Sequence, residues 1–164
     1  KLYNMGVVNG DGTGGFAPYR NVTREEFVKM LLLALDVEAD SDGTPTFSDV
    51  DDGSWFAPYV ALAYKAGIVS GISPTEFGTG LSITRQDLAV MIARCLEYKG
   101  ITLDSKADAE DFADQSEISG YALEAVKYLR DAGIFNGDSY YNFNPASFAT
   151  RAEVAKVLGI LLEK

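Results

Sequence analysis

Three arginines occupy a position that a helix does not favour for a cation. Arg24, Arg85 and Arg151 each follow a threonine, and each begins a segment whose apolar residues have helical spacing. The helix dipole places a partial positive charge at this end, so an arginine there costs roughly a few tenths of a kcal/mol. Two interpretations remain open. The arginines form ion pairs with some of the many acids, or they join free amides of the helix end to bind a carboxylate or phosphate.

Two aromatic and two acidic residues could complete a carbohydrate site. Trp55 and Tyr121 either pack as core residues or offer ring faces on which a sugar stacks. Asp49 and Asp114 accept hydrogen bonds either from turn amides, which is the interpretation we prefer, or from sugar hydroxyls. The 24 acidic residues do not exclude a carboxylate pair for glycoside hydrolysis, but on a chain of net charge −10 most of them should be solvated surface. We therefore expect no enzyme and no catalytic residue.

The composition excludes several classes of function. The chain has no histidine, which removes the commonest general base and most zinc sites. Its single cysteine, Cys95, forms no internal disulfide. The net charge of −10 disfavours nucleic-acid binding, and no apolar run approaches the ~20 residues that membrane insertion needs. The stretch 7–16, VVNGDGTGGF, has only part of the EF-hand ligand pattern, so we expect a turn and neither metal nor cofactor.

The arginines recur because the chain repeats itself. The segments 6–10, 67–71 and 133–137 read GVVNG, GIVSG and GIFNG, and each Thr-Arg pair begins 17 residues after the first glycine. A phenylalanine follows that glycine by 10 residues in every copy, whereas only the second and third copies show an upstream half that begins Phe-x-Asp. We predict a single domain over 1–164, with repeats over 1–38, which is partial, 47–100 and 112–164.

Each copy predicts a helix–loop–helix unit. After every Thr-Arg pair the apolar residues recur at i, i+3, i+4, i+7 and i+8, which is typical of a helix with one buried face. A threonine and an acid three residues later form the pattern of a capping box, in the pairs Thr23 and Glu26, Thr84 and Asp87, and Thr150 and Glu153. Three such units favour a mostly all-α fold, in which the three capped helices face one another around a pseudo-threefold axis.

These motifs together resemble the surface-layer homology (SLH) domain. The shared pattern is F-x-D, an aromatic residue, GI-x-x-G, a phenylalanine, and T-R with an acid two residues on. The second copy carries it as Phe47-Ser48-Asp49, Trp55, 67–71, Phe77 and 83–87, and the third as Phe112-Ala113-Asp114, Tyr121, 133–137, Phe143 and 150–153. The first copy retains 6–10, Phe16 and 23–26, so the likeness covers nearly the whole chain.

The resemblance implies a fold and a function. SLH triplets form a spindle around a central three-helix bundle, and they anchor extracellular bacterial proteins noncovalently to the cell wall. Their usual ligand is a secondary cell wall polysaccharide attached to peptidoglycan, often with a pyruvylated terminal amino sugar whose ketal carboxylate meets the Thr-Arg arginine. The chain would then be one module of a larger surface protein. The alternative is a structural protein-interaction module within a surface layer.

The expected polysaccharide-binding residues lie in grooves between repeats: Arg24, Arg85, Arg151, Trp55, Tyr121, Asp49, Asp114, Gly10, Gly71 and Gly137. In the first copy the Phe-x-Asp and tryptophan positions would precede Lys1. This puts in doubt the groove between the first and third copies. The grooves between the first and second copies and between the second and third copies are therefore expected to be the most complete.

Overall fold

The computed structural model describes residues 1–9, 15–39, 46–105 and 109–164. Its elements are helices: α1 (Arg24–Ala34), α2 (Ala57–Lys65), α3 (Arg85–Lys99), the 3-10 turn η1 (Gln115–Glu117), α4 (Leu123–Asp131) and α5 (Arg151–Leu161). Within these ranges strand pairing is limited to isolated β-bridges. The predicted mostly helical class is confirmed. None of the helices in the described ranges is both long and apolar enough to span a bilayer.

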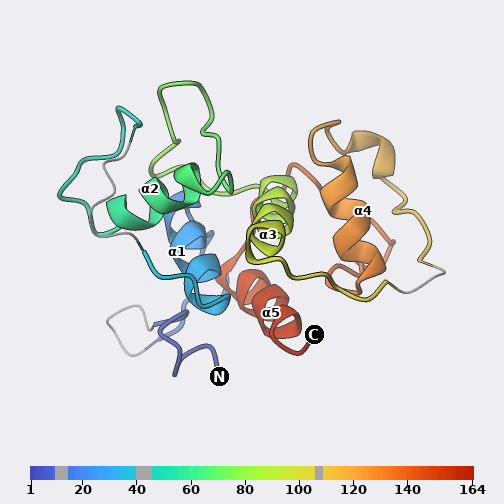
Figure 1. Ribbon diagram of the computed structural model, residues 1–164. Helices are drawn as coiled ribbons and strands as arrows, with labels where there is room; N and C mark the ends of the chain where they lie inside the picture. The colour runs from blue at the N-terminus through green and yellow to red at the C-terminus, as the bar shows by residue number, and fades with distance from the viewer. Residues whose placement is uncertain (10–14, 40–45, 106–108) are drawn as a thin grey trace.

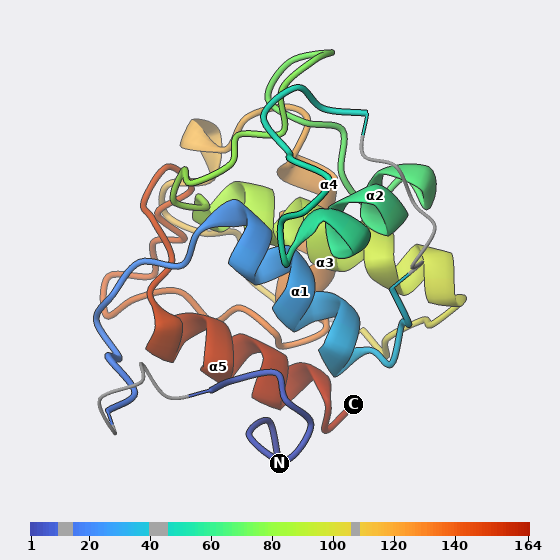
Figure 2. The same cartoon turned by 90° about the vertical axis from the view of Figure 1, so that its left-hand side faces the viewer.

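The three capped helices α1, α3 and α5 lie together, with α2 and α4 on the outside (Figure 1, and turned by 90° in Figure 2). α1 packs against α3 and α5, α2 packs against α1, and α4 packs against α3. The upstream helix of one copy therefore covers the capped helix of the copy before it. These contacts between helices of different copies hold the copies together as one packed unit.

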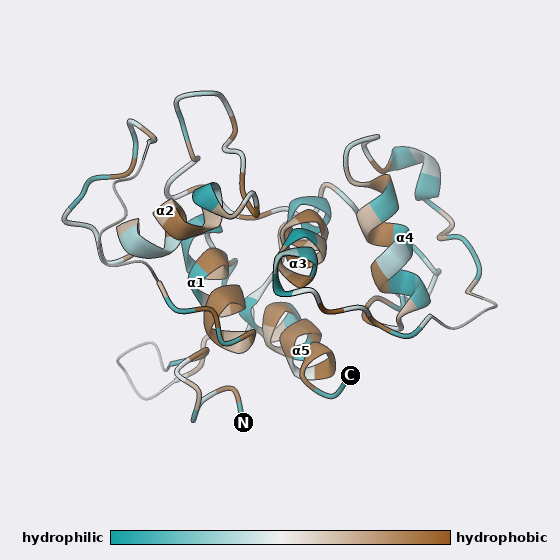
Figure 3. Cartoon of the chain, viewed as in Figure 1, coloured by the Kyte–Doolittle hydropathy of each residue, from teal (hydrophilic) through white to brown (hydrophobic). Residues whose placement is uncertain are grey.

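The core lies where the apolar stripes of these helices meet, and Figure 3 colours the apolar parts of the α1, α3 and α5 ribbons brown. Phe27 and Leu31 of α1, Ile92 of α3 and Leu158 of α5 are fully buried. The loop phenylalanines Phe77 and Phe143 are buried as well. The loops are therefore anchored in the core and have a fixed position relative to the helices.

A closed ring of backbone hydrogen bonds joins the three copies just before their capped helices. The amide of Val22 donates to the carbonyl of Ala149 at 3.0 Å, Ala149 donates to Ile83 at 3.0 Å, and Ile83 donates back to Val22 at 2.9 Å. All three side chains are buried. Each copy thus gives one hydrogen bond and receives one, and the starting points of the three helices are fixed relative to one another.

Two of the three predicted capping boxes are complete. Thr23 and Thr150 accept from the amides of Glu26 and Glu153, whose carboxylates accept in return from the cap amides. Thr84 accepts from the Asp87 amide at 3.2 Å, but the Asp87 side chain turns to other partners. The third box therefore has only its threonine half. The prediction that the acid caps the Thr84 amide is wrong, because the Asp87 carboxylate binds Arg24 and Tyr121 instead.

Thr150→Ala should lower the free energy of unfolding by about 1 kcal/mol, since the Glu153 amide loses its acceptor. Thr150→Ser retains the hydroxyl and should stay close to the wild-type value. Urea unfolding followed by circular dichroism measures both. Equal stability of the alanine variant and the wild type would show that the cap contributes nothing.

Candidate functional site: three pockets between the copies

Each Thr-Arg arginine reaches into the loop of the next copy. The Nε of Arg24 donates to the carbonyl oxygen of Phe77 at 3.0 Å, and its guanidinium carbon lies 5.3 Å from the centre of the Phe77 ring. Arg85 does the same with Phe143, at 2.7 Å and 5.3 Å. Arg151 closes the circle with Phe16 of the first copy, at 2.9 Å and 5.0 Å. The arginines therefore lock neighbouring copies together.

Two of these arginines also form ion pairs between copies. Arg24 Nη1 lies 2.8 Å from an oxygen of Asp87, and Arg85 Nη1 lies 3.3 Å from an oxygen of Glu153. Both acids occupy the third position of the next capped helix. The ion-pair interpretation is confirmed for Arg24 and Arg85, and it explains why a cation is tolerated at this end of a helix.

The expectation of free amides is wrong for the first amide of each capped helix and for the second amide of α3 and α5. The Arg24 amide donates to Leu81, the Arg85 amide to Ser147 and the Arg151 amide to Arg20, each at 2.9 Å. In α3 and α5 the following amides donate to the carbonyls of Pro145 and Pro18. The amides are used because the neighbouring copy runs directly across the helix ends. An anion bound here cannot use these amides.

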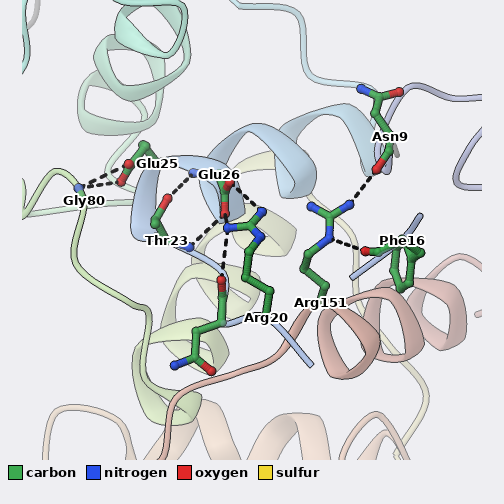
Figure 4. Close-up of polar contacts among 9 residues, drawn as sticks. Asn9, Phe16, Arg20, Thr23, Glu25, Glu26, Gly80 and Arg151 are labelled. Atoms are coloured by element: carbon green, nitrogen blue, oxygen red, sulfur yellow. Dashed lines mark hydrogen bonds and ion pairs between the residues drawn. The ribbon is translucent and has the colours of Figure 1, made fainter. Parts of the chain in front are cut away.

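Arg151 differs from the other two arginines in its partners (Figure 4). Its Nη2 donates to the carbonyl of Asn9 at 2.6 Å, so both of its described acceptors are neutral carbonyls. The matching acid, Glu26, is held instead by both terminal nitrogens of Arg20, at 2.8 and 3.1 Å. Burial raises the pKa of Glu26, but the bonds from Arg20 and from the Thr23 amide outweigh it and lower the pKa. Arg151 thus retains a charge that no described carboxylate contacts directly.

The three arginines line three pockets that are equivalent in the repeat. The Arg24 pocket has a volume of about 370 Å³, the Arg85 pocket about 300 Å³ and the Arg151 pocket about 270 Å³. Each is built from an arginine of one copy and from the glycine-containing loop and capped helix of the next. These volumes lie near the lower end of those of small-molecule sites, ~300 Å³, which is suited to a compact ligand.

The predicted aromatic residues lie at the pockets and not in the core. Trp55 lines the Arg151 pocket and is 54% exposed, and Tyr121 lines the Arg24 pocket and is 61% exposed. The Lys29 ammonium lies 5.1 Å from the centre of the Trp55 ring. The Tyr121 hydroxyl donates to Asp87 at 2.6 Å. The core interpretation is wrong for both, and their exposed rings are available for stacking.

The aromatic residue of each pocket comes from a third copy. Trp55 of the second copy completes the pocket between the third and first copies, and Tyr121 of the third copy completes the pocket between the first and second copies. By the same rule, the aromatic position of the Arg85 pocket belongs to the first copy. The expected ranking of grooves assigned the upstream half of the first copy to the groove between the first and third copies. The arrangement of Trp55 and Tyr121 assigns its aromatic position instead to the groove between the second and third copies.

Asp49 and Asp114 hold loops within their own copies. Asp49 accepts from the amides of Phe77, Gly78 and Thr79 at 2.7 to 2.8 Å, and Asp114 accepts from Phe143 and Asn144 at 2.7 Å. Neither acid lines one of the three pockets. The preferred turn interpretation is confirmed. Both acids hold the phenylalanine loop that an arginine of the preceding copy contacts. Their assignment to polysaccharide binding stays a prediction.

The two described motif glycines line pockets but are required by the backbone. Gly71 has φ +78°, and an added Cβ would lie 2.5 Å from the carbonyl oxygen of Glu76. Gly137 has φ +75° and a Cβ there would lie 3.3 Å from the carbonyl oxygen of Asn142. Gly10, the third member of this set, and half of the calcium-like stretch 7–16 lie outside the described residues. Gly71 and Gly137 shape the loops that form a wall of the Arg24 and Arg85 pockets.

Tyr121 should titrate later than an ordinary tyrosine. Burial, followed by the hydrogen bond to Asp87 and its charge, raises the pKa of Tyr121 to about 12. A spectrophotometric titration of tyrosinate should show this late phase, and Tyr121→Phe should remove it. Asp87→Asn is the matched control, because it keeps an acceptor for the hydroxyl but removes the charge, and it should shift the phase to lower pH. A late phase that survives in Tyr121→Phe would refute the assignment.

Sequence reasoning missed four basic residues that line the pockets. Lys29 and Lys156 lie five residues after Arg24 and Arg151 and reach the Arg151 and Arg85 pockets. Arg94 lines the Arg24 pocket, and Arg20 lines the Arg151 pocket. The shared spacing of Lys29 and Lys156 in two copies was a usable signal. Arg20 and Arg94 have no basic residue at the matching positions of the other copies, so the repeat pattern did not indicate them.

Comparison with known proteins identifies the repeat. The profile of the S-layer homology domain matches residues 1–28, 46–89 and 111–155. Over 99% of its length the chain is 34% identical to an endoglucanase of Bacillus sp. (strain KSM-635), of which it covers 17%. It is 35% identical to 9% of an amylopullulanase of Thermoanaerobacterium thermosulfurigenes, again over 99% of the chain.

A third relative is named as a surface-layer protein. Over 99% of the chain, the sequence is 29% identical to the surface-layer 125 kDa protein of Lysinibacillus sphaericus, of which it covers 13%. The chain thus spans less than a fifth of each of these relatives. The profile matches fall on the three copies and cover more than half of the chain, so the chain belongs to the S-layer homology domain family, whose members are cell-surface modules associated with the cell wall.

Proposed function

We propose that the chain anchors its parent protein to the bacterial cell wall by binding an acidic secondary wall polysaccharide in the pockets between its copies. The observation that carries the proposal is the distribution of charge. Of the 13 basic residues that the structure describes, seven line the three pockets, against four of the 20 described acidic residues. On a chain of net charge −10 this concentration of cations creates local anion sites.

The ligand class follows from the walls of the pockets. A guanidinium offers a planar pair of donors that matches a carboxylate. Trp55 and Tyr121 present exposed rings beside that donor, which suits a sugar whose apolar face can stack. A terminal sugar that carries a carboxylate, such as a pyruvate ketal, uses both features in one small ligand.

The Arg151 pocket is the strongest anion receptor of the three. A carboxylate that approaches Arg24 or Arg85 must compete with Asp87 or Glu153, which already form ion pairs there. At Arg151 the competing acid is held by Arg20, and Lys29 adds a further positive charge. Among the residues that the structure describes, the pocket at Arg151 therefore offers a cation without requiring an existing ion pair to break.

A sedimentation assay with purified cell-wall sacculi tests the function. The protein should sediment with intact sacculi and stay in solution after the polysaccharide is removed with acid. Sacculi whose pyruvate ketals have been removed should bind weakly. Binding that survives removal of the polysaccharide would refute the proposal and favour a protein-interaction module instead.

Arg151→Ala should weaken binding to wall polysaccharide by about tenfold or more, which is at least ~1.4 kcal/mol of binding free energy. The loss arises because the carboxylate of the ligand loses the guanidinium of Arg151, which forms no ion pair with a described acid of the protein. Lys127→Ala is the control, since it removes the same charge from α4, away from the three pockets. Isothermal titration with soluble polysaccharide measures both, and circular dichroism verifies the fold. Equal weakening by the two variants would show that only net charge matters.

A further inference from the structure

A groove between α3 and α4 continues the Arg24 pocket. It has a volume of about 510 Å³ and shares Val90, Arg94 and Tyr121 with that pocket. The two cavities therefore meet, and the ring of Tyr121 stands where they join. Because its hydroxyl donates to Asp87 at 2.6 Å, this ring is held in place while 61% of the residue stays exposed.

The groove depends on features that distinguish α3 from its counterparts. α3 has 15 residues, whereas α1 and α5 have 11 each. The additional turn contributes Leu96 and Glu97 to the groove. Arg94 stands where α1 has Leu33 and α5 has Ile160. The second cation of the Arg24 pocket therefore lies about one helical turn further along its helix, toward the groove, than Lys29 and Lys156 do in the other two pockets.

The opposite wall is open because α4 carries a small residue. Ala125 lines the groove, whereas the equivalent position of α2 is Tyr59. The Tyr59 ring lies 5.7 Å from the Lys29 ammonium, so in that copy a large side chain lies over the face of α1. A tyrosine is therefore compatible with this position of the repeat, and alanine leaves space.

The two cavities differ in charge. The Arg24 pocket has two arginines against Asp87, whereas the groove has Arg94 against the acids Glu97 and Glu124. The groove is thus not an anion site. Its carboxylates and the Thr102 hydroxyl can accept hydrogen bonds from hydroxyl groups, and Ile101 offers an exposed apolar surface beside them. This combination fits an uncharged sugar.

We propose that the Arg24 pocket and the α3–α4 groove form one extended site for at least two consecutive sugars of the polysaccharide. The acidic terminal sugar occupies the pocket, the next, uncharged sugar occupies the groove, and Tyr121 and Arg94 contact both. The proposal rests on the proposed function, because it extends the same binding site. It predicts that this site, unlike a pocket for a terminal residue alone, distinguishes ligands by length.

Site-resolved nuclear magnetic resonance titrations test the extended site. The probes are the pyruvate-ketal terminal monosaccharide and a tetrasaccharide with the same end, both released from the wall polysaccharide. In the wild type, both should shift the amide signals of Ser70 and Asp87 in the pocket, and only the tetrasaccharide should shift those of Glu97 and Thr102. The tetrasaccharide should also bind this site about tenfold more tightly.

Ala125→Tyr fills the groove with the side chain that α2 has at the same position. It should reduce the affinity for the tetrasaccharide to that for the monosaccharide and leave the monosaccharide affinity unchanged. Glu97→Ala, on the exposed edge of α3, should reduce only the tetrasaccharide affinity, without blocking the groove. Retention of the helical signal in both variants shows that the fold is intact.

Three results would overturn the inference, in different ways. If the tetrasaccharide shifts the pocket signals but not those of Glu97 and Thr102, the extended site is refuted while the proposed function stands. If Ala125→Tyr weakens both ligands equally, the groove has no separate role. If neither ligand shifts signals in any pocket, the proposed function itself fails.

Discussion

Asp49→Ala is expected to lower the free energy of unfolding by about 3 kcal/mol. The carboxylate accepts three backbone amides, from Phe77, Gly78 and Thr79, and two of these residues are buried. Hydrogen bonds to a charged group contribute about 1.5–3 kcal/mol each, and a buried amide without an acceptor is costly. The same loop supplies the Phe77 carbonyl to Arg24, so the contact between the first two copies should weaken as well.

The acid dependence of stability provides an independent measure. Burial alone would raise the pKa of Asp49, but the amides of Thr79, Phe77 and Gly78 outweigh it and lower the pKa. A carboxyl with a lowered pKa stabilises the fold above its unfolded pKa of about 3.9, and this stability is lost as the pH falls through the folded value. Asp49→Asn should remove this part of the acid dependence and should destabilise less than alanine. An unchanged profile of stability against pH in Asp49→Asn would contradict the assignment.

Arg24→Ala is expected to lower the free energy of unfolding by about 3 kcal/mol, more than Arg85→Ala or Arg151→Ala. Arg24 is 5% exposed, and its loss leaves the Phe77 carbonyl and one oxygen of Asp87 without their partner. Removing one member of a buried ion pair costs about 3–5 kcal/mol. Arg24→Lys keeps the charge but lacks the planar group that serves both acceptors, so it should recover only part of the stability.

Urea unfolding of the three alanine variants tests this order. Arg151 has no described carboxylate partner, so Arg151→Ala should be the mildest. Equal stabilities of the three variants would show that the ion pairs contribute nothing measurable. The order also guides the binding experiments. A loss of binding in Arg24→Ala could arise from lower stability as well as from a lost ligand contact. A loss of binding in Arg151→Ala is expected to arise from the lost ligand contact.

Features that depend on neighbouring residues were predictable from the sequence. The capping boxes at Thr23 and Thr150 and the buried faces of α1, α3 and α5 follow from spacings within a few residues. In both cases the interaction and the sequence pattern have the same short range. The turn role of Asp49 was also preferred correctly, but the amides that it accepts belong to residues 28 to 30 positions away, and no local pattern identifies them.

Features that depend on how the copies meet were not predictable. Asp87 looked like a capping residue, but in the structure it binds Arg24 and Tyr121, which lie 63 and 34 residues away. The helix-end amides looked free because their acceptors belong to the next copy. The same holds for Trp55, whose pocket lies between the two other copies. A single sequence contains no spacing that relates these partners.

The closed ring of Val22, Ile83 and Ala149 sets the smallest size at which the module is complete. Every copy presents one donor and one acceptor, and each is satisfied by a different neighbour. A tandem of two copies would leave one of each unpaired, together with an arginine that has no loop to contact. A fourth copy would find no free place in the circle. A tandem shortened by one copy is therefore expected to lose stability as well as pockets, because the same contacts between copies support both.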